Sequence, residues 1–274
     1  MRAMIEDFGC ARLEIADAVA IFTMDNPARR NAMGPAMVSA LRRALDRVTA
    51  PGAGARCLLL TGAGRVFCSG GDLAESQEIV QSRAAGDRDA GAHYTLEMLH
   101  HPVIRRLRDL PIPLLTAVNG AAVGMGLSYA LLGDLIVLTS SAYLTARFVK
   151  VGMSPDAGQS WLLPRIVGTV RAREMLMLGE KISAEQALSW GLVNRVYPDD
   201  SFAAEARSLA HRLAHGPTLA LREIRKLSWQ AWRNTHDEHL DMEERMQIAL
   251  GHTHDGQEGI NAFIEKRDPD FRGS

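Results

Sequence analysis

The sequence of 274 residues predicts an α/β fold with a parallel sheet, followed by a helical tail. Over residues 1–199, short apolar runs alternate with segments of helical spacing, which is typical of strands that pair in parallel. From residue 200 onward the pattern is helical only, with breaks at Gly216-Pro217 and Gly251. We therefore expect a core over residues 1–199 and a helical tail over residues 200–274. Such a tail packs on another subunit or folds back over a site.

The first half of the chain begins with two alternating runs around Asp17-Ala18, which predict a hairpin over residues 11–24. Apolar residues then fall on one face of residues 35–49, and Pro35 suits the first turn of that amphipathic helix. The elements expected next are a buried strand at 57–61, a loop at 62–73, an irregular and mobile helix at 74–92 and helical segments over 93–109.

Residues 113–134 are the most informative stretch. An apolar run at 114–118 predicts a buried strand, a turn containing Gly120, Gly124 and Gly126 follows it, and then a helical pattern begins. The backbone N–H groups at the start of a helix lack partners within the helix, and glycine lets another group approach them closely. The stretch therefore predicts a turn that can bind a carbonyl oxygen.

The second half of the core contains two further strand candidates, at residues 135–139 and 192–197. Between them, Met153-Ser154-Pro155 predicts a loop, because proline and serine favour turns. Asp156 follows this loop and is well placed to cap a helix over residues 157–164.

The composition excludes several classes of protein. Hydrophobic residues make up 47% of the chain, and 31 basic residues balance 32 acidic ones, so the basic excess of a nucleic-acid or membrane-surface protein is missing. Cys10, Cys57 and Cys68 cannot all pair with one another and are not at metal-binding spacing, which suggests a reducing compartment. Neither a signal-like N-terminus nor an apolar run of about 20 residues is found. We expect a soluble, cytoplasmic protein.

A second glycine-rich turn, at residues 62–73, also follows a buried strand. In a parallel sheet both turns open at the same edge, where two N–H groups can converge on one oxyanion. Nucleotide binding is a weaker alternative, because Tyr129 occupies the place of the third glycine of a dinucleotide fingerprint and no lysine precedes Ser69 as in a phosphate loop. The stronger alternative is that both are simply tight turns.

Several motifs in order resemble those of the crotonase, or enoyl-CoA hydratase/isomerase, superfamily. They are DNPARRNAM, LLLTGAGRVFCSGGDL, AVNGAAVGMGLSYALLGDLIV, VGMSPDAGQSWLLPRIVG, ISAEQALSWGLVNRVY and FIEKRDPDF. The resemblance spans nearly the whole chain. It implies an α/β spiral of ββα units with a C-terminal helical trimerisation region, and homotrimers that pair into hexamers. It also implies acyl-CoA thioester substrates, with coenzyme A as part of the substrate and no permanently bound cofactor.

The resemblance also implies site residues. The oxyanion donors are the N–H groups of Gly71 and Met125, and Met125 departs from the glycine usual in the family. A methionine keeps the N–H group, and its side chain can narrow the acyl pocket. The residues implied for coenzyme A are Arg29, Ala32, Ser69, Asp72 and Leu73, together with Phe263 and Lys266 of the tail, which often meet the coenzyme A of a neighbouring subunit.

The acid and base groups distinguish the reactions of the superfamily. A hydratase uses two glutamates, whose positions here hold Ser128 and Phe148, and neither side chain can replace a carboxylate. Asp156 matches a carboxylate of several family isomerases, where one carboxylate moves a proton between carbons while the oxyanion hole holds the enolate. The structural alternative is that Asp156 only caps its helix.

Three other functions stay open at the level of sequence. In the 4-chlorobenzoyl-CoA dehalogenase branch, the matching aspartate attacks the aromatic ring and a histidine, aligned with His101, activates water. A hydratase with relocated acid and base groups is the second, and a non-catalytic acyl-CoA binder is the third.

The remaining candidates for site chemistry are better explained as ordinary structure. His211 and His215 are four residues apart and His236 and His239 three apart, but no cysteine or paired carboxylate completes a metal set in the sequence. We expect surface histidines and no metal. Cys68 lies beside the expected site without an evident base, so we expect it to be a packing residue.

Overall fold

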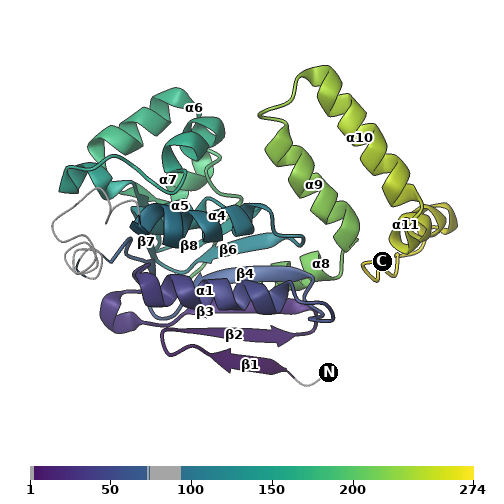
Figure 1. The fold of residues 1–274 in the computed structure, drawn as a ribbon, viewed down its shortest axis with the longest axis horizontal. Coiled ribbons are helices and arrows are strands. Elements are labelled where there is room, and N and C mark those ends of the chain that lie inside the picture. Colours follow the sequence, from purple (N-terminus) through teal and green to yellow (C-terminus); the bar gives the residue numbers. More distant parts are fainter. Residues whose placement is uncertain (1–2, 73, 75–93) are drawn as a thin grey trace.

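The computed structural model describes residues 3–72, 74 and 94–274, and contains two β-sheets with helices around them (Figure 1). The larger sheet has seven strands in the order β1-β2-β3-β4-β6-β8-β11. Its strands are β1 (Met4–Asp7), β2 (Ala11–Ala16), β3 (Val19–Met24), β4 (Cys57–Gly62), β6 (Leu114–Val118), β8 (Leu135–Thr139) and β11 (Arg195–Tyr197). The smaller sheet, in the order β10-β9-β7-β5, contains β5 (Val66–Cys68), β7 (Ala121–Val123), β9 (Tyr143–Thr145) and β10 (Ile182–Ser183).

The parallel pairing expected from the sequence is confirmed for β3, β4, β6, β8 and β11. The predicted hairpin is also confirmed, since β2 and β3 pair antiparallel around Asp17 and Ala18, both of which have positive φ. Strand β1 was not predicted. It lies at the edge of the sheet and its side chains are mostly exposed, so it carries little of the alternation that marks a half-buried strand.

Successive strands leave the larger sheet and enter the smaller one. The chain runs from β4 to β5, from β6 to β7 and from β8 to β9. Each of these three units thus contributes its first strand to the larger sheet and its second strand to the smaller one. The sequence predicted a loop over residues 62–73 and a turn after residue 118, and both predictions missed the strands β5 and β7. Strands of three residues are too short to show a period, and only their partners in the second sheet define them.

The helices agree with the predicted helical segments. Those of the core are α1 (Pro35–Val48), α4 (His101–Arg108), α5 (Met125–Ala130), α6 (Gln159–Leu178) and α7 (Ala184–Ser189), with a π-helix η2 (Tyr94–His100) and two 3₁₀ turns, η1 (Pro27–Arg29) and η3 (Arg147–Val151). Those of the tail are α8 (Phe202–Ala214), α9 (Thr218–Gln230), α10 (His236–Gly251) and α11 (His254–Glu265). The irregular helix expected over residues 74–92 lies, apart from Ala74, outside the described residues. No helix in the described ranges is long and apolar enough to cross a membrane.

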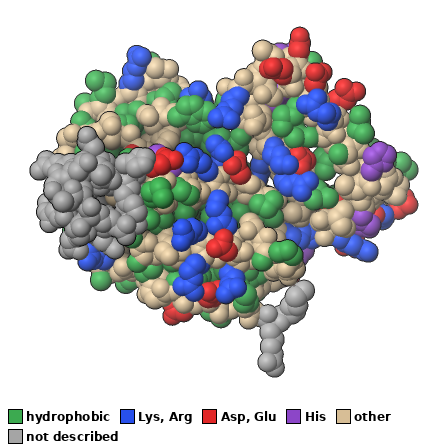
Figure 2. Space-filling view, viewed as in Figure 1, with side chains coloured by type: hydrophobic (Ala, Val, Ile, Leu, Met, Phe, Trp, Pro, Cys, Tyr) green, Lys and Arg blue, Asp and Glu red, His purple; other side chains and the backbone are tan. Residues whose placement is uncertain are grey.

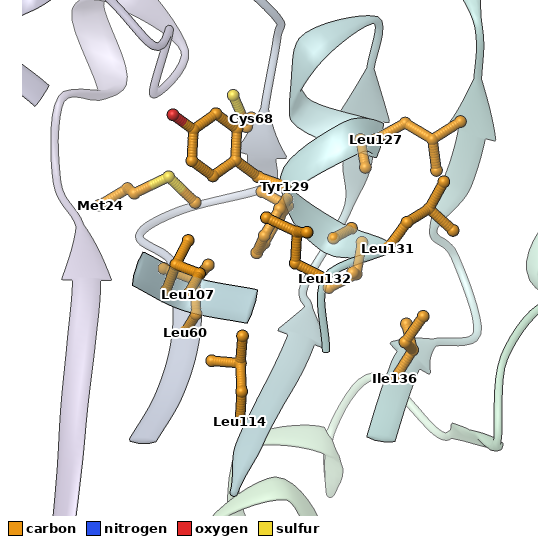
Figure 3. Close-up of a cluster of buried hydrophobic side chains, with 14 of the residues drawn as sticks. Met24, Leu60, Cys68, Leu107, Leu114, Leu127, Tyr129, Leu131, Leu132 and Ile136 are labelled. Carbon is orange, nitrogen blue, oxygen red and sulfur yellow. The ribbon is translucent and has the colours of Figure 1, made fainter. Parts of the chain in front are cut away.

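The core is centred on α5, all of whose side chains are buried. Figure 3 shows side chains of α5 and of the turn after it, among them Leu127, Tyr129 and Leu132, inserted among residues of β3, β4 and β6. Helix α1 buries the face that the sequence predicted. The start of α5, which carries the glycine-rich turn, is therefore held by packing from several elements.

The tail helices differ in what they cover. Helix α8 packs on the larger sheet, where Phe202, Ala206 and Leu209 are buried against Ile21 and Leu59. Helices α9, α10 and α11 extend away from the sheets (Figure 1). The predicted division at residues 199 and 200 stays a prediction, because α8 belongs to the packing of the core.

Arg225 of α9 ties the tail to the core. Its side chain is 5% exposed and forms an ion pair with Asp134 at 2.5 Å. The guanidinium also donates hydrogen bonds to the carbonyl oxygens of Leu107, at 3.0 Å, and Leu110. Asp134 in turn accepts a hydrogen bond of 2.6 Å from the backbone N–H of Leu114, the first residue of β6. One buried cation thus links α9, the end of α4 and the strand that leads to the glycine-rich turn.

We predict that Arg225→Ala lowers the free energy of unfolding by about 1–3 kcal/mol, because the Leu107 and Leu110 carbonyl oxygens lose their buried donor and Asp134, whose side chain is 23% exposed, loses its counter-ion. Denaturant unfolding followed by circular dichroism measures this loss. The matched control is Lys226→Ala on the same helix, whose side chain is 52% exposed, and we expect it to change the free energy by less than about 1 kcal/mol. Equal effects of the two variants would contradict the assigned role of Arg225.

Candidate active site

The first part of the candidate site is the turn between β7 and α5. Gly124 has φ 53° and ψ −120°, a backbone conformation in the left-handed half of the map that favours glycine. Helix α5 begins at the next residue, Met125, whose N–H group has no acceptor within the helix because it belongs to the first turn. The turn therefore presents a backbone donor at the start of α5, as the sequence predicted.

The second part is the segment after β5. Met33 forms an isolated parallel bridge with Gly71, and the Met33 N–H donates to the carbonyl oxygen of Gly70 at 2.8 Å. The Gly70 C=O and the Gly71 N–H belong to one trans peptide and point in opposite directions, so the Gly71 N–H faces away from Met33. A methyl group added to Gly70 would lie 3.9 Å from the Met125 amide nitrogen, and one added to Gly71 would lie 4.0 Å from Met125 Cε. The two expected oxyanion donors are thus neighbours in space.

The separation of these two segments depends on Gly126. A methyl group at this position would lie 2.5 Å from the carbonyl oxygen of Cys68 and 2.9 Å from its Sγ. Contacts this short are not tolerated, and the opposing atoms include backbone, which cannot rotate away. The absence of a side chain at Gly126 therefore lets α5 approach the end of β5 closely enough for the two donors to converge.

Asp156 does not cap a helix, so the structural alternative considered for it is wrong. Helix α6 begins at Gln159 with Gly158 as its N-cap, and no side chain caps it. Ala157 and Gly158 both have positive φ, 52° and 83°, and this turn separates the Asp156 carboxyl from the helix. Asp156 Oδ1 is buried and has no hydrogen-bond partner among the residues that the structure describes.

Burial raises the pKa of Asp156 from 3.8 to about 6, and the nearby charge of His101 opposes this rise. A carboxylate with such a pKa is ionised at neutral pH but accepts a proton more readily than an exposed one. A partly buried carboxylate with one unpaired oxygen is suited to moving a proton to and from a substrate carbon.

Gln159 was not singled out in the sequence, but the structure places it in the site. Its side chain is fully buried, and its Nε2 donates to the Gly124 carbonyl oxygen at 2.9 Å and to Ser128 Oγ at 3.3 Å. The Ser128 hydroxyl donates to the backbone carbonyl of Asp156 at 3.3 Å. The amide of Gln159 thus connects the glycine-rich turn to the segment that carries the Asp156 carboxylate. A lone glutamine beyond a Pro-Asp turn has no local signal that would have identified it.

His101 lies at the start of α4 and pairs with Glu97 at 2.7 Å between Nδ1 and Oε2. The hydrogen bonds from His101 and Arg105 lower the pKa of Glu97. The adjacent His100 is buried instead, with Nδ1 3.2 Å from the Tyr129 hydroxyl, and burial lowers its pKa to about 4. The two histidines therefore have different roles, and His100 is a neutral core residue.

Comparison with known proteins identifies the family of the chain. The model of the family described as enoyl-CoA hydratase/isomerase matches residues 14–274. The chain belongs to this family. Its members act on acyl-CoA thioesters, and the crotonase-like α/β fold expected from the sequence motifs is thereby confirmed.

Individual relatives in the family carry the names of different reactions. The 1,2-epoxyphenylacetyl-CoA isomerase of Escherichia coli is 39% identical over 94% of this chain and 97% of its own length. The 4-chlorobenzoyl coenzyme A dehalogenase-2 of an Arthrobacter species is 35% identical over 75% of this chain and 72% of its own. The solved structure of an enoyl-CoA hydratase from Polaromonas sp. JS666 has a TM-score of 0.86 at 34% identity, over 96% of this chain and all of that one. Because these names include an isomerase, a dehalogenase and a hydratase, similarity alone does not decide which reaction this chain catalyses.

The segments expected to hold coenzyme A lie against one another. The Ser69 N–H donates to the Arg30 carbonyl oxygen at 3.1 Å, and the Ser69 hydroxyl donates to that of Arg29 at 3.3 Å. The Arg29 guanidinium forms an ion pair with Asp72 at 2.8 Å, yet its side chain remains 57% exposed. Ala32 follows Arg29 on the same loop and is half-buried. These four residues therefore stay a predicted coenzyme A surface, whereas Leu73 lies outside the described residues.

Phe263 and Lys266 lie at the far end of the tail. Phe263 is 85% exposed on α11, and Figure 1 shows α11 at one end of the molecule, well separated from α5 and α7 in the core. The two residues do not join the site of their own chain. Their expected contact with the coenzyme A of a neighbouring subunit stays a prediction, as do the trimer and the hexamer.

Two other features lie near the candidate site. Cys68 is fully buried, and burial raises the pKa of its thiol to about 12, so it is the unreactive packing residue that the sequence predicted. A cavity of about 480 Å³ lies between α4, α6 and α9, next to the backbone of Ala157 and Gly158, and Figure 2 shows basic side chains around the hollow between the core and the tail. Arg105, Arg108 and Lys226 on its walls are paired with acidic neighbours.

We predict that Gly126→Ala lowers turnover of an acyl-CoA substrate by roughly 10–100-fold, because the methyl group forces α5 away from Cys68 and misplaces the Met125 N–H. Steady-state kinetics measures this, and circular dichroism verifies the fold. The control is Gly251→Ala, where an added methyl meets nothing within 4 Å, and full activity is expected. A folded Gly126→Ala variant with unchanged turnover would show that this contact does not position the oxyanion hole.

Proposed function

We propose that this protein is an enoyl-CoA isomerase, which shifts a double bond in an acyl-CoA thioester by proton transfer through Asp156. The observation that carries the proposal is the carboxyl of Asp156, which is partly buried, raised in pKa and without a hydrogen-bond partner on Oδ1 in the described part of the chain. A structural carboxylate would have its partners, since an unsatisfied buried acceptor is unfavourable.

The proposed reaction needs one base and one electrophilic site. Asp156 removes a proton from C2 of a 3-enoyl thioester, and the electrons of the C–H bond move into the thioester to form a dienolate. The N–H groups of Gly71 and Met125 donate to the resulting oxyanion, an arrangement in which each donor contributes about 2.7–4 kcal/mol. The protonated Asp156 then returns the proton to C4, and the double bond moves to C2–C3 in conjugation with the carbonyl.

Hydration is less well supported, because it needs a second acid or base to deliver the elements of water. The position of the first hydratase glutamate holds Ser128, which is fully buried and donates to a backbone carbonyl. The position of the second holds Phe148, whose ring lies 3.8 Å from where a methyl group on Gly124 would be. Ser128 therefore supports the Asp156 backbone and Phe148 packs near Gly124, so Asp156 is the one carboxylate that the proposed reaction can use as a base.

We predict that Asp156→Asn lowers kcat by about 10²–10⁴-fold while binding of the acyl-CoA is kept, because the amide cannot accept the proton. The gain of conjugated-thioester absorbance from a 3-enoyl-CoA measures turnover, and calorimetry measures binding. For the wild type, kcat/KM should fall about tenfold per pH unit below pH 6, where Asp156 becomes protonated. The same substitution at the exposed Asp46 is the control and should have no effect.

Stability separates this role from a structural one. The pKa of Asp156 is higher in the folded protein than the ordinary 3.8, so the native state holds the proton more tightly and loses stability as the pH rises from about 4 to about 6. At pH 7, Asp156→Asn should therefore raise the free energy of unfolding, by up to about 3 kcal/mol. Full turnover in the variant, or hydration of crotonyl-CoA by the wild type, would contradict the proposal. Saturable binding of thioesters with no conversion of any would indicate a non-catalytic binder.

A hydrolytic dehalogenase-like reaction is the second candidate. It is favoured by the Glu97–His101 pair, because a carboxylate on Nδ1 orients the ring and leaves Nε2 to activate water. A dehalogenase is also among the relatives. In this reaction Asp156 attacks an aryl carbon, halide leaves, and water activated by His101 hydrolyses the aryl ester.

The His101→Gln variant distinguishes the two candidates. For an isomerase we predict that it changes kcat by less than about tenfold, because proton transfer requires only Asp156. For a hydrolase it should abolish the release of halide from a 4-halobenzoyl-CoA. The measurements are halide release and isomerase absorbance on the same preparations, and halide release by the wild type that His101→Gln abolishes would overturn the isomerase assignment.

A further inference from the structure

Three metal-ligating side chains that the proposed reaction does not use converge at one end of the larger sheet. Asp17 comes from the turn between β2 and β3, and His211 and His215 come from the last turn of α8 and the residue after it. Their ligand atoms all lie within 4.8 Å of one another. His211 Nε2 is 2.6 Å from Asp17 Oδ2, and His215 Nε2 is 3.7 Å from Asp17 Oδ1. Within the described residues this is the one such group of three.

The tautomer of His215 leaves a lone pair in this cluster. Its Nδ1 lies 2.9 Å from the carbonyl oxygen of His211, and a carbonyl can only accept, so Nδ1 carries the proton. In the neutral ring Nε2 then has no proton, and it faces a carboxylate oxygen that also lacks one. A backbone carbonyl on the second nitrogen is the usual support of a metal-binding histidine, because it orients the ring and makes it more basic.

The carboxylate and the two rings are held in place by the fold. The Asp17-Ala18 turn has two positive φ angles and is closed by the Ala16–Val19 pair of the hairpin. The Ala18 carbonyl oxygen also accepts from the Arg56 N–H at 2.7 Å. The His211 and His215 rings are stacked, with centroids 3.9 Å apart. All three groups stay exposed, with side-chain exposures of 70%, 52% and 45%, so an ion can reach them and complete its coordination with water.

We propose that Asp17, His211 and His215 form a binding site for a divalent late first-row metal ion of the zinc type. Two imidazoles and one carboxylate suit this class of metal and do not suit magnesium or calcium, which prefer oxygen ligands. With bonds of about 2.0–2.1 Å and tetrahedral angles, ligand atoms should be roughly 3.3 Å apart. The observed 2.6 and 3.7 Å bracket this value. The two stacked rings must rotate apart on binding, so that the in-plane lone pairs of both histidines meet at the ion. Binding displaces the proton between His211 Nε2 and Asp17 to solvent.

Such an ion would join the β2–β3 hairpin to the end of α8, two segments that are 194 residues apart in the sequence. A ligand that binds only the folded state raises the melting temperature, and the rise grows with the logarithm of the free ligand concentration above the dissociation constant. The consequence of the site is therefore stability of the sheet-to-tail junction, and it does not depend on the proposed isomerase reaction.

The experiment titrates the full chain, without a histidine tag and pre-treated with chelator, with Zn²⁺ by calorimetry and with Co²⁺ by visible absorption. We expect one saturable site per chain, a rise in the melting temperature with Zn²⁺, and no response to Mg²⁺. Asp17→Asn and His215→Ala should each weaken binding about tenfold or more. Asparagine tolerates the left-handed turn, so Asp17→Asn tests the ligand without disturbing the hairpin.

The matched control is His239→Ala. His239 and Glu243 are also four residues apart, at 3.6 Å, but in the described part of the chain no third ligand joins them. This variant should bind Zn²⁺ like the wild type, and acyl-CoA turnover should be unchanged in all three variants. Absence of Zn²⁺ binding, or binding that persists in Asp17→Asn and His215→Ala or is lost in His239→Ala, would overturn the assignment.

Discussion

The close contact between Gly126 and the backbone of Cys68 is the constraint on which the candidate site depends. It brings the start of α5 against the end of β5, and these two segments carry the two backbone donors expected to bind a thioester oxygen. The surrounding strands and helices hold these two segments in contact. Parallel strands β4 and β6 deliver both segments to the same edge, and the fully buried α5 cannot shift without disturbing the core. Precise placement of backbone donors thus follows from a missing side chain in a rigid setting.

The carboxylate of Asp156, the base of the proposed reaction, lowers the stability of the folded state when it is ionised. Its partly buried environment disfavours the negative charge, and this desolvation raises its pKa. The turn through Ala157 and Gly158 keeps the carboxylate from capping α6. Gln159 supports both halves of the site, since its amide donates to the turn before Met125 and to the serine that holds the Asp156 backbone. A reactive group left unsatisfied among well-satisfied neighbours is a common feature of catalytic sites.

The tail is joined to the core by polar contacts between residues distant in sequence. Arg225 reaches the ends of α4 and the start of β6, whereas Asp17 of the hairpin meets the two histidines that close α8. The first contact stabilises the junction because the Arg225 guanidinium is buried and would be an unpaired charge without Asp134 and the two carbonyl oxygens. The second is exposed and open to solvent, which makes it available to an ion.

Local patterns in the sequence determined much of this protein. Apolar runs identified β4, β6 and β8, the spacing of apolar residues identified the buried face of α1, and the glycine-rich turn with the later motifs identified the family. Tertiary structure alone decided the rest. The strands β5, β7 and β9 exist because they pair with one another, Gln159 matters because it meets Gly124, and Asp17 joins His211 across 194 residues. The freedom of Asp156 from its helix was decided by two positive φ angles that no local preference of Ala157 predicts. The period of apolar residues predicts which face of a helix or strand is buried. Contacts between side chains from elements that are distant in the sequence have no such local pattern, so only the tertiary structure shows them.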